Sequence, residues 1–134
     1  MIALLGRAMK DGEPFARGLA HFNAGEFFEA HEAWEQIWLG AADPEKSFLQ
    51  GMIQIAAAFH HHGRGNSRGT QSLLAAGLIK IDAFPDGHRG LALAEIRNEA
   101  RKWIQGLAEG KDLSRQQPPR IRLSRTKKRG RRAG

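Results

Sequence analysis

Residues 47–62 read SFLQGMIQIAAAFHHH, and this stretch decides the fold. Its apolar residues recur at helical spacing and leave almost no side of the helix polar. A helix that is apolar nearly all round is typical of a central, buried position. Because no segment shows the strict alternation of a half-buried strand, the sequence predicts an all-α protein.

Capping and breaking signals divide the chain into a compact bundle of about five helices. Asp43 and Pro44 form a typical start for the central helix, since Asp is a favoured N-cap and Pro fits the first helical position. Glycines follow several apolar runs, as expected at helix C-termini. The expected helices cover residues 14–25, 26–39, 43–63, 66–84 and 91–107.

The positive charge of the chain is concentrated at its C-terminal end. The 134 residues carry a net charge of +7. Residues 1–110 contain 11 Lys/Arg and 13 Asp/Glu, whereas residues 111–134 contain ten Lys/Arg and a single Asp. The second part has few apolar residues and cannot bury enough surface to offset the entropy of ordering. We therefore predict a helical domain over 1–110 and a basic, largely disordered tail over 111–134, of which PPRIRL (118–123) is the part expected to lie extended along the body.

Composition also limits the compartment and the chemistry. The chain has no cysteine, which excludes thiolate catalysis and thiolate metal sites and fits a reducing compartment. The first residues, MIALLGRAMK, hold too short an apolar run for a signal-peptide core or a membrane span. We expect a cytoplasmic protein without a membrane partner. Substrate, reaction and oligomeric state are not encoded in any pattern we recognise, so whether the protein is an enzyme stays open.

The stretch FFEAHEAWEQIW (27–38) resembles the zinc-protease motif H-E-x-x-H, but Glu35 stands where the second histidine should be. On a helical wheel, His31 lies within the aromatic stripe of this segment and Glu35 lies at its edge. Glu32, which would be the general base of a protease, faces solvent on the same wheel. This geometry weakens the protease interpretation and leaves His31 and Glu35 as a candidate polar pair.

A polar stripe formed by Gln50, Gln54 and His61 runs along the central helix. An unpaired buried amide costs about 1–3 kcal/mol, so this stripe needs partners. The preceding helix is joined by a short loop, is expected to be antiparallel, and offers His31 and Glu35. Two interpretations follow: a closed polar network that fixes helix register, or a ligand-binding or catalytic site.

Two local patterns suggest ion binding, each with a structural alternative. A divalent metal ion would use His31, Glu35 and His61, since imidazole and carboxylate are good ligands and glutamine is a poor one. The run 60–62 cannot serve one ion, because consecutive helical side chains fan out by about 100°. The stretch GRGNSRG (63–69) precedes a helix and could hold a phosphate, but it follows a helix rather than a strand, which favours a capped turn.

The basic tail suggests a second function, the binding of nucleic acid or another polyanion. Ten positive side chains suffice for salt-sensitive, non-specific binding. The tail has no aromatic residue, so base stacking and sequence preference are not expected from it. A solubilising extension is the alternative. The candidate residues are Arg120, Arg122, Arg125, Lys127, Lys128, Arg129, Arg131 and Arg132.

The segments FNAGEFFEAHEAWEQIW (22–38) and FLQGMIQIAAAFHHHGRGNSRGTQSLL (48–74) resemble a prokaryotic family known as domain of unknown function, family 309. The resemblance extends over roughly residues 13–84. It implies a compact all-helical domain and a site, but no activity that can be transferred, and it draws attention to Glu32. The candidate ligand-binding residues are His31, Glu32, Glu35, Gln50, Gln54, His61 and Asn66.

Overall fold

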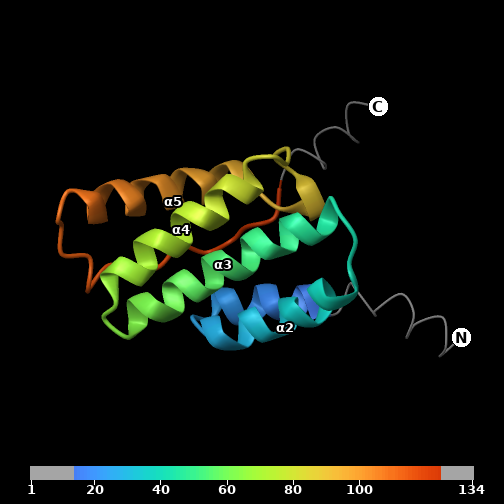
Figure 1. The fold of residues 1–134 in the computed structure, drawn as a ribbon, viewed down its shortest axis with the longest axis horizontal. Coiled ribbons are helices and arrows are strands. Elements are labelled where there is room, and N and C mark those ends of the chain that lie inside the picture. Colours follow the sequence, from blue (N-terminus) through green and yellow to red (C-terminus); the bar gives the residue numbers. More distant parts are fainter. Residues whose placement is uncertain (1–13, 125–134) are drawn as a thin grey trace, which may run out of the picture.

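The computed structural model describes residues 14–124 as a bundle of α-helices (Figure 1). The five α-helices within this range confirm the predicted all-α class. None of them combines the length and the apolar character that a membrane span needs. The first helix covers residues 14–23. It is followed by α2 (Phe27–Gly40), α3 (Glu45–Gly63), α4 (Ser67–Ile81), the short 3-10 helix η1 (His88–Gly90) and α5 (Leu93–Ala108).

Helix α3 is the central helix, as its composition predicts. It packs against α2 on one side and α4 on the other, and α4 packs in turn against α5 (Figure 1). Phe48, Leu49 and Met52 are fully buried, and Phe59 is only 1% exposed. The ring of Phe59 makes edge-to-face contact with Trp103 of α5 at 5.1 Å between centroids. The helix thus contributes to the core on several sides.

The first helix and α2 meet where a glycine faces a tryptophan. Trp34 is fully buried, and its indole Nε1 donates a hydrogen bond of 3.1 Å to the carbonyl oxygen of Phe15. A methyl group at Gly18 would lie only 2.3 Å from that same nitrogen. The absence of a side chain at Gly18 therefore lets the indole lie flat against the first helix.

Helices α3 and α4 also approach closely through glycines. A methyl group at Gly77 of α4 would lie 2.8 Å from the carbonyl oxygen of Gly51, and one at Gly51 would lie 2.8 Å from the Ile81 side chain. Neither glycine has a positive φ, so the need here is for space rather than for backbone freedom. Close packing at this crossing explains why Gly51 interrupts the apolar run of the central helix.

Helix α3 begins at Glu45 with Pro44 as its N-cap, one residue later than predicted, and ends at Gly63 as predicted. Asp43 accepts hydrogen bonds from the hydroxyl and the backbone N–H of Ser47, at 2.7 and 2.9 Å. The hydrogen bond from the Ser47 hydroxyl lowers the pKa of the Asp43 carboxyl below its usual range, and the one from the Ser47 backbone N–H adds a smaller effect in the same direction. Helix α4 was predicted to reach Phe84, but it ends at Ile81. The ring of Phe84 instead packs edge-on against Phe48, at 5.2 Å.

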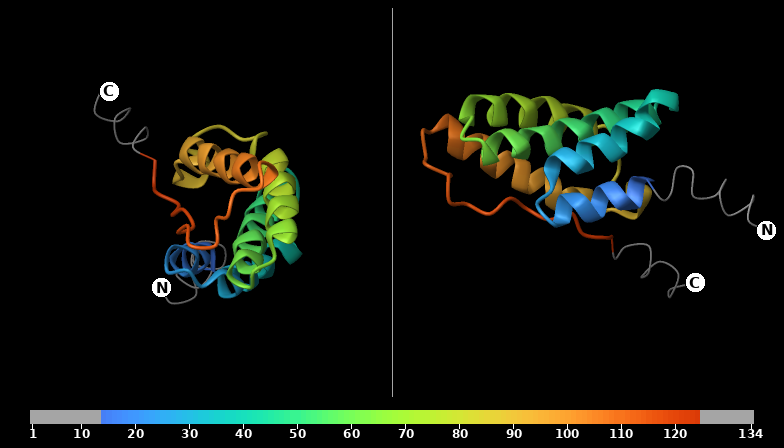
Figure 2. Two further views of the ribbon diagram at one scale, coloured as in Figure 1. Left: turned by 90° about the vertical axis from the view of Figure 1, so that its left-hand side faces the viewer. Right: turned by 90° about the horizontal axis from the view of Figure 1, so that it is seen from below.

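Residues 111–124, here called the return segment, run from the end of α5 back along the bundle (Figure 2). Ile121 anchors the segment in the core with 3% exposure. Its backbone N–H and carbonyl oxygen bond to the Asn23 side chain at 2.8 and 3.0 Å. A backbone hydrogen bond of 2.8 Å from Ala92 to Arg122 ties the same stretch to the start of α5.

This packing shows that the chain is still ordered after residue 111, where the predicted disordered tail begins. The extended course expected for 118–123 is present, and it belongs to a longer ordered stretch. Residues 111–124 were included in the segment predicted to be largely disordered, but they contribute a buried side chain and main-chain hydrogen bonds. Apolar Ile121 and Leu113 supply burial that the average composition of the segment conceals. Residues 125–134 lie outside the described residues.

The contact between Gly18 and Trp34 generates the first prediction. Gly18→Ala should lower the free energy of unfolding by roughly 1–3 kcal/mol, because the methyl group displaces a buried indole. Gly63→Ala is the matched control, since a methyl group at that helical glycine meets nothing within 4 Å. Urea denaturation followed by tryptophan fluorescence measures both. Equal stability of the two variants would show that the first helix can shift to accommodate the methyl group without a loss of stability.

Candidate functional site

The site predicted from the sequence lies along the seam between antiparallel α2 and α3. The two ends of this seam are marked by contacts between side chains. At one end, the ring of Phe28 lies 5.7 Å from that of His60. At the other end, the Lys46 ammonium lies 4.5 Å from the ring centre of Trp38. His31 and Glu35 lie on α2 between Phe28 and Trp38.

The structure brings His31 and Glu35 together. The His31 Nε2 atom lies 3.8 Å from a carboxylate oxygen of Glu35, and the two side chains are 28% and 50% exposed. The imidazole stacks on the ring of Phe28, with 6.0 Å between centroids. The pair is therefore open to solvent at the carboxylate and partly covered at the imidazole.

Two predicted site residues carry a buried polar atom with no hydrogen-bond partner. These atoms are Nδ1 of His31 and Oε1 of Gln54, each without a protein partner within residues 14–124. Most buried polar side-chain atoms are satisfied by protein or by ordered water, so an exception calls for an explanation. His31 lies on α2 and Gln54 on the adjacent α3, the two helices that form the predicted seam.

The remaining residues of the α2 and α3 prediction lie at the surface or near it. Glu32 is exposed, as the helical wheel predicts. Gln50 is half-buried on α3, one turn before Gln54. Neither residue makes a side-chain hydrogen bond within the described part of the chain. Their positions are compatible with contact to a ligand but do not define one.

His61 has a different environment from the one predicted. Its Nδ1 atom lies 3.0 Å from the side-chain nitrogen of Asn66, in the turn between α3 and α4. Asn66 is the N-cap of α4 and accepts a hydrogen bond of 3.0 Å from the N–H of Gly69. The expectation that His61 faces His31 is thus replaced by a local pair, because the turn supplies a nearer partner.

The stretch 63–69 forms the capped turn that was the alternative to a phosphate loop. Gly65 adopts a φ of +76°, which favours glycine. A methyl group at Gly69 would lie 2.5 Å from the Asn66 side chain, so this glycine leaves room for the cap. His61, Gly65, Asn66 and Gly69 therefore each have a structural role in the turn.

The predicted metal set is not assembled in this structure. His31 and Glu35 lie near each other, whereas His61 bonds to Asn66 at the turn. Within residues 14–124, no three His, Asp or Glu side chains lie close enough together to hold a metal ion. The arrangement on α2 therefore offers one imidazole and one carboxylate.

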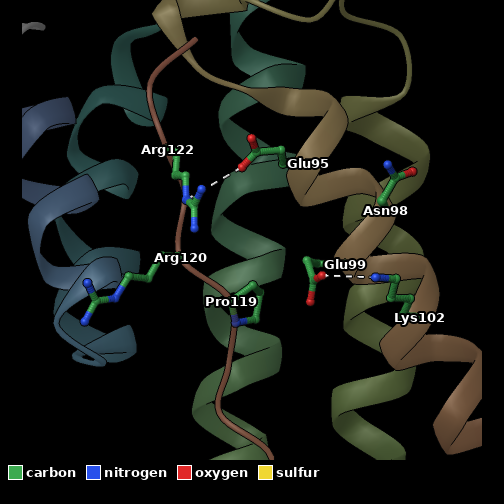
Figure 3. Close-up of a pocket in the computed structure, with 7 residues that line it drawn as sticks. All are labelled: Glu95, Asn98, Glu99, Lys102, Pro119, Arg120 and Arg122. Atoms are coloured by element: carbon green, nitrogen blue, oxygen red, sulfur yellow. Dashed lines mark ion pairs between the residues drawn. The ribbon is translucent and has the colours of Figure 1, made fainter. Parts of the chain in front are cut away.

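The described part of the nucleic-acid prediction lies beside α5 (Figure 3). A groove of about 420 Å³ separates α5 from the return segment. Arg122 lies 3.9 Å from Glu95 across this groove, and Arg120 points away from α5 (Figure 3). Charges of both signs line the groove, so it is not a uniformly positive surface. The other six candidates, Arg125, Lys127, Lys128, Arg129, Arg131 and Arg132, lie outside the described residues.

Comparison with known families finds a match for part of the helical bundle. Residues 15–73 match the family described as Domain of unknown function (DUF309). This match confirms the resemblance drawn from the sequence. The DUF309 match covers the described first helix, α2, α3 and the first half of α4, and it therefore includes both sides of the seam. Helix α5 and the return segment lie outside it.

Two relatives are similar to part of this chain. An uncharacterized protein of Aquifex aeolicus (strain VF5) is 34% identical over 77 residues, which cover 57% of this chain and 23% of the relative. The uncharacterized protein YpuF of Bacillus subtilis (strain 168) is 39% identical over 61 residues, which cover 43% of this chain and 34% of the relative. The chain thus spans well under half the length of these curated relatives.

One polar cluster escaped the sequence analysis. Glu45, at the start of α3, accepts hydrogen bonds from both His88 and Arg89 of η1. Glu45 is more than 40 positions from His88 and Arg89 in the sequence, so no local spacing links it to them. The sequence shows only a helix start at one site and a Pro-Asp-Gly breaker before the other.

The turn after α3 generates the second prediction. Asn66→Ala should lower the free energy of unfolding by about 1 kcal/mol, because α4 loses its N-cap. Ser67→Ala, one residue further on, should change it by less than about 0.5 kcal/mol. Thermal and urea unfolding test both variants. A stable Asn66→Ala protein would argue that this asparagine has a role other than capping.

Proposed function

We propose that the seam between α2 and α3 binds a small ligand that donates hydrogen bonds, with His31, Glu35 and Gln54 as its contacts. The observation that carries the proposal is the pair of buried, unpartnered atoms, His31 Nδ1 and Gln54 Oε1. Leaving a buried donor or acceptor unsatisfied costs about 1–3 kcal/mol. A ligand that satisfies both atoms recovers that free energy on binding.

The chemistry of the contacts favours a cationic donor. When the imidazole proton is on Nε2, which faces the Glu35 carboxylate at 3.8 Å, Nδ1 is an acceptor. The Gln54 oxygen is an acceptor as well, and Glu35 adds a negative charge. An amine in its ammonium form matches the two acceptors, and the nearby Glu35 carboxylate favours its positive charge and disfavours an anion.

The family resemblance supports this choice of residues. The glycines and the capping asparagine in the shared pattern have structural roles at the turn and at the crossing of α3 and α4. His31 and Gln54 belong to the same pattern, yet the fold leaves one atom of each unsatisfied. Residues that a shared pattern contains but the fold does not use are candidates for binding.

Titration with methylammonium tests the third prediction. NMR on the full chain monitors the titration. We expect saturable changes in the imidazole ¹⁵N signals of His31 and in the side-chain amide signals of Gln54. Acetate and acetamide serve as anionic and neutral probes and should cause smaller changes. His31→Gln should weaken methylammonium binding by about tenfold, the effect of losing one charge-assisted contact.

The matched control is His21→Gln, which removes another histidine paired with a glutamate. His21 lies 2.7 Å from Glu26, away from the seam. This variant should bind methylammonium like the unchanged chain. Independent responses of His31 and Gln54, or equal responses to acetate, would contradict the proposal and favour a closed network completed by water.

A second candidate function is the binding of nucleic acid or another polyanion by the basic C-terminal residues. It is favoured by the return segment, which holds Arg115, Arg120 and Arg122 exposed on the body and leads into residues 125–134. Positive side chains that lie along a nucleic-acid backbone neutralise its phosphates and release counterions.

We also propose a cytoplasmic location, which the lack of cysteine supports.

Truncation after Ser124 tests the fourth prediction. It removes six Lys/Arg residues and keeps the Ile121 anchor, so the body should remain folded. Affinity for an oligo-dT strand at low salt should fall by more than about tenfold, and the slope of log K against log salt should become shallower by up to ~0.7 per lost contact. A full-length chain with the same six residues changed to Gln should behave like the truncated one. Unchanged oligo-dT affinity in either variant would show that the helical bundle, and not the six basic residues, binds the nucleic acid.

A further inference from the structure

A recess lies at the opposite end of α2 from Phe28, beside the loop between α2 and α3. That loop is on the right-hand side of Figure 1. It has a volume of about 700 Å³. Its walls come from elements that are distant in sequence: the start of the described first helix, the end of α2, the loop before α3, and η1. The lining residues are Pro14, Gln36, Ile37, Gly40, Ala41, Ala42, Glu45 and Arg89.

The polar wall of the recess is built around Glu45. One carboxylate oxygen accepts a hydrogen bond of 3.1 Å from Nε2 of His88, and the other accepts one from Nε of Arg89. The side chains of these three residues are 23–30% exposed. Partial burial makes such charge-assisted contacts stronger than at an open surface. Glu45 therefore fixes the position of the Arg89 side chain.

Arg89 is also held by its backbone and by an aromatic ring. Its φ is +55°, the left-handed region that residues other than glycine rarely adopt. Its guanidinium carbon lies 4.6 Å from the ring centre of Phe15. Backbone strain of this kind persists where the surroundings determine it, and such positions cluster at functional sites.

The remaining edge of the guanidinium has no hydrogen-bond partner among residues 14–124. Nε is occupied by Glu45 and one face lies on Phe15, whereas the two terminal nitrogens make no hydrogen bond within residues 14–124. These nitrogens form a planar fork that matches the two oxygens of a carboxylate. A preorganised arginine fork is thus present on the wall of a recess.

We propose that this recess binds a small aliphatic carboxylate, with Arg89 as the residue that holds the carboxylate. The apolar walls formed by Ile37, Ala41 and Pro14 suit a short hydrocarbon chain. The neighbouring Glu45 carboxylate disfavours a doubly charged phosphate more than a singly charged carboxylate. This site is separate from the α2–α3 seam and does not rest on its function.

Hexanoate is the probe for this inference, with inorganic phosphate and hexanol as comparisons. The full chain is titrated by ¹H–¹⁵N NMR, and the Nε signal of Arg89 and the backbone signals of Ile37 and Ala41 are followed. Hexanoate should shift these signals saturably and with at least about tenfold higher affinity than hexanol or phosphate. Equal affinity for hexanol would show a merely apolar recess, and tighter binding of phosphate would reject the carboxylate assignment.

Two variants distinguish a role of the Arg89 guanidinium in binding from a role in folding. Arg89→Gly removes the side chain and accepts the left-handed backbone without strain, so the protein stays folded. It should lose hexanoate affinity by about tenfold or more. Arg101→Gln is the matched control, since Arg101 pairs with Asp82 away from the recess, and it should bind normally. Full hexanoate affinity in Arg89→Gly would overturn the proposal.

Discussion

The structure depends on one constraint: α3 is apolar on almost all sides and must be covered on all of them. A helix with one apolar stripe needs one neighbour, but α3 contributes nine buried residues distributed around its axis. The first helix and α2 cover one side, and α4 and α5 cover the other (Figures 1 and 2). The return segment adds the buried Ile121. The short connections between helices follow from this need, since each neighbour must turn back along α3.

Close contacts at glycine make this coverage tight. Gly18 accommodates the buried indole of Trp34, and Gly51 and Gly77 let α3 and α4 approach. Protein interiors are packed at the density of organic crystals, so one added methyl group at such a contact is felt. Along the seam between α2 and α3, His31 Nδ1 and Gln54 Oε1 are buried without a hydrogen-bond partner among residues 14–124.

Two surfaces with different chemistry result from this arrangement. The seam between α2 and α3 lies within the segment that matches DUF309 and presents acceptors and a carboxylate. The recess at Arg89 draws on η1, which lies outside that segment, and presents a guanidinium fork beside apolar walls. A small cation and a small aliphatic anion are the respective ligands we propose.

The sequence by itself determined the helical class, the central helix, most helix starts and the pairing of His31 with Glu35. These features depend on periodicity, capping and i,i+4 spacing, which act over a few residues. Only the tertiary structure decided that His61 bonds to Asn66 rather than facing His31, that Ile121 anchors the return segment, and that Glu45 meets His88 and Arg89. The last two contacts join residues 40 or more positions apart, and helical periodicity carries no information on which surfaces meet at that range. The His61–Asn66 contact spans only five positions, and the geometry of the turn between α3 and α4 decides it.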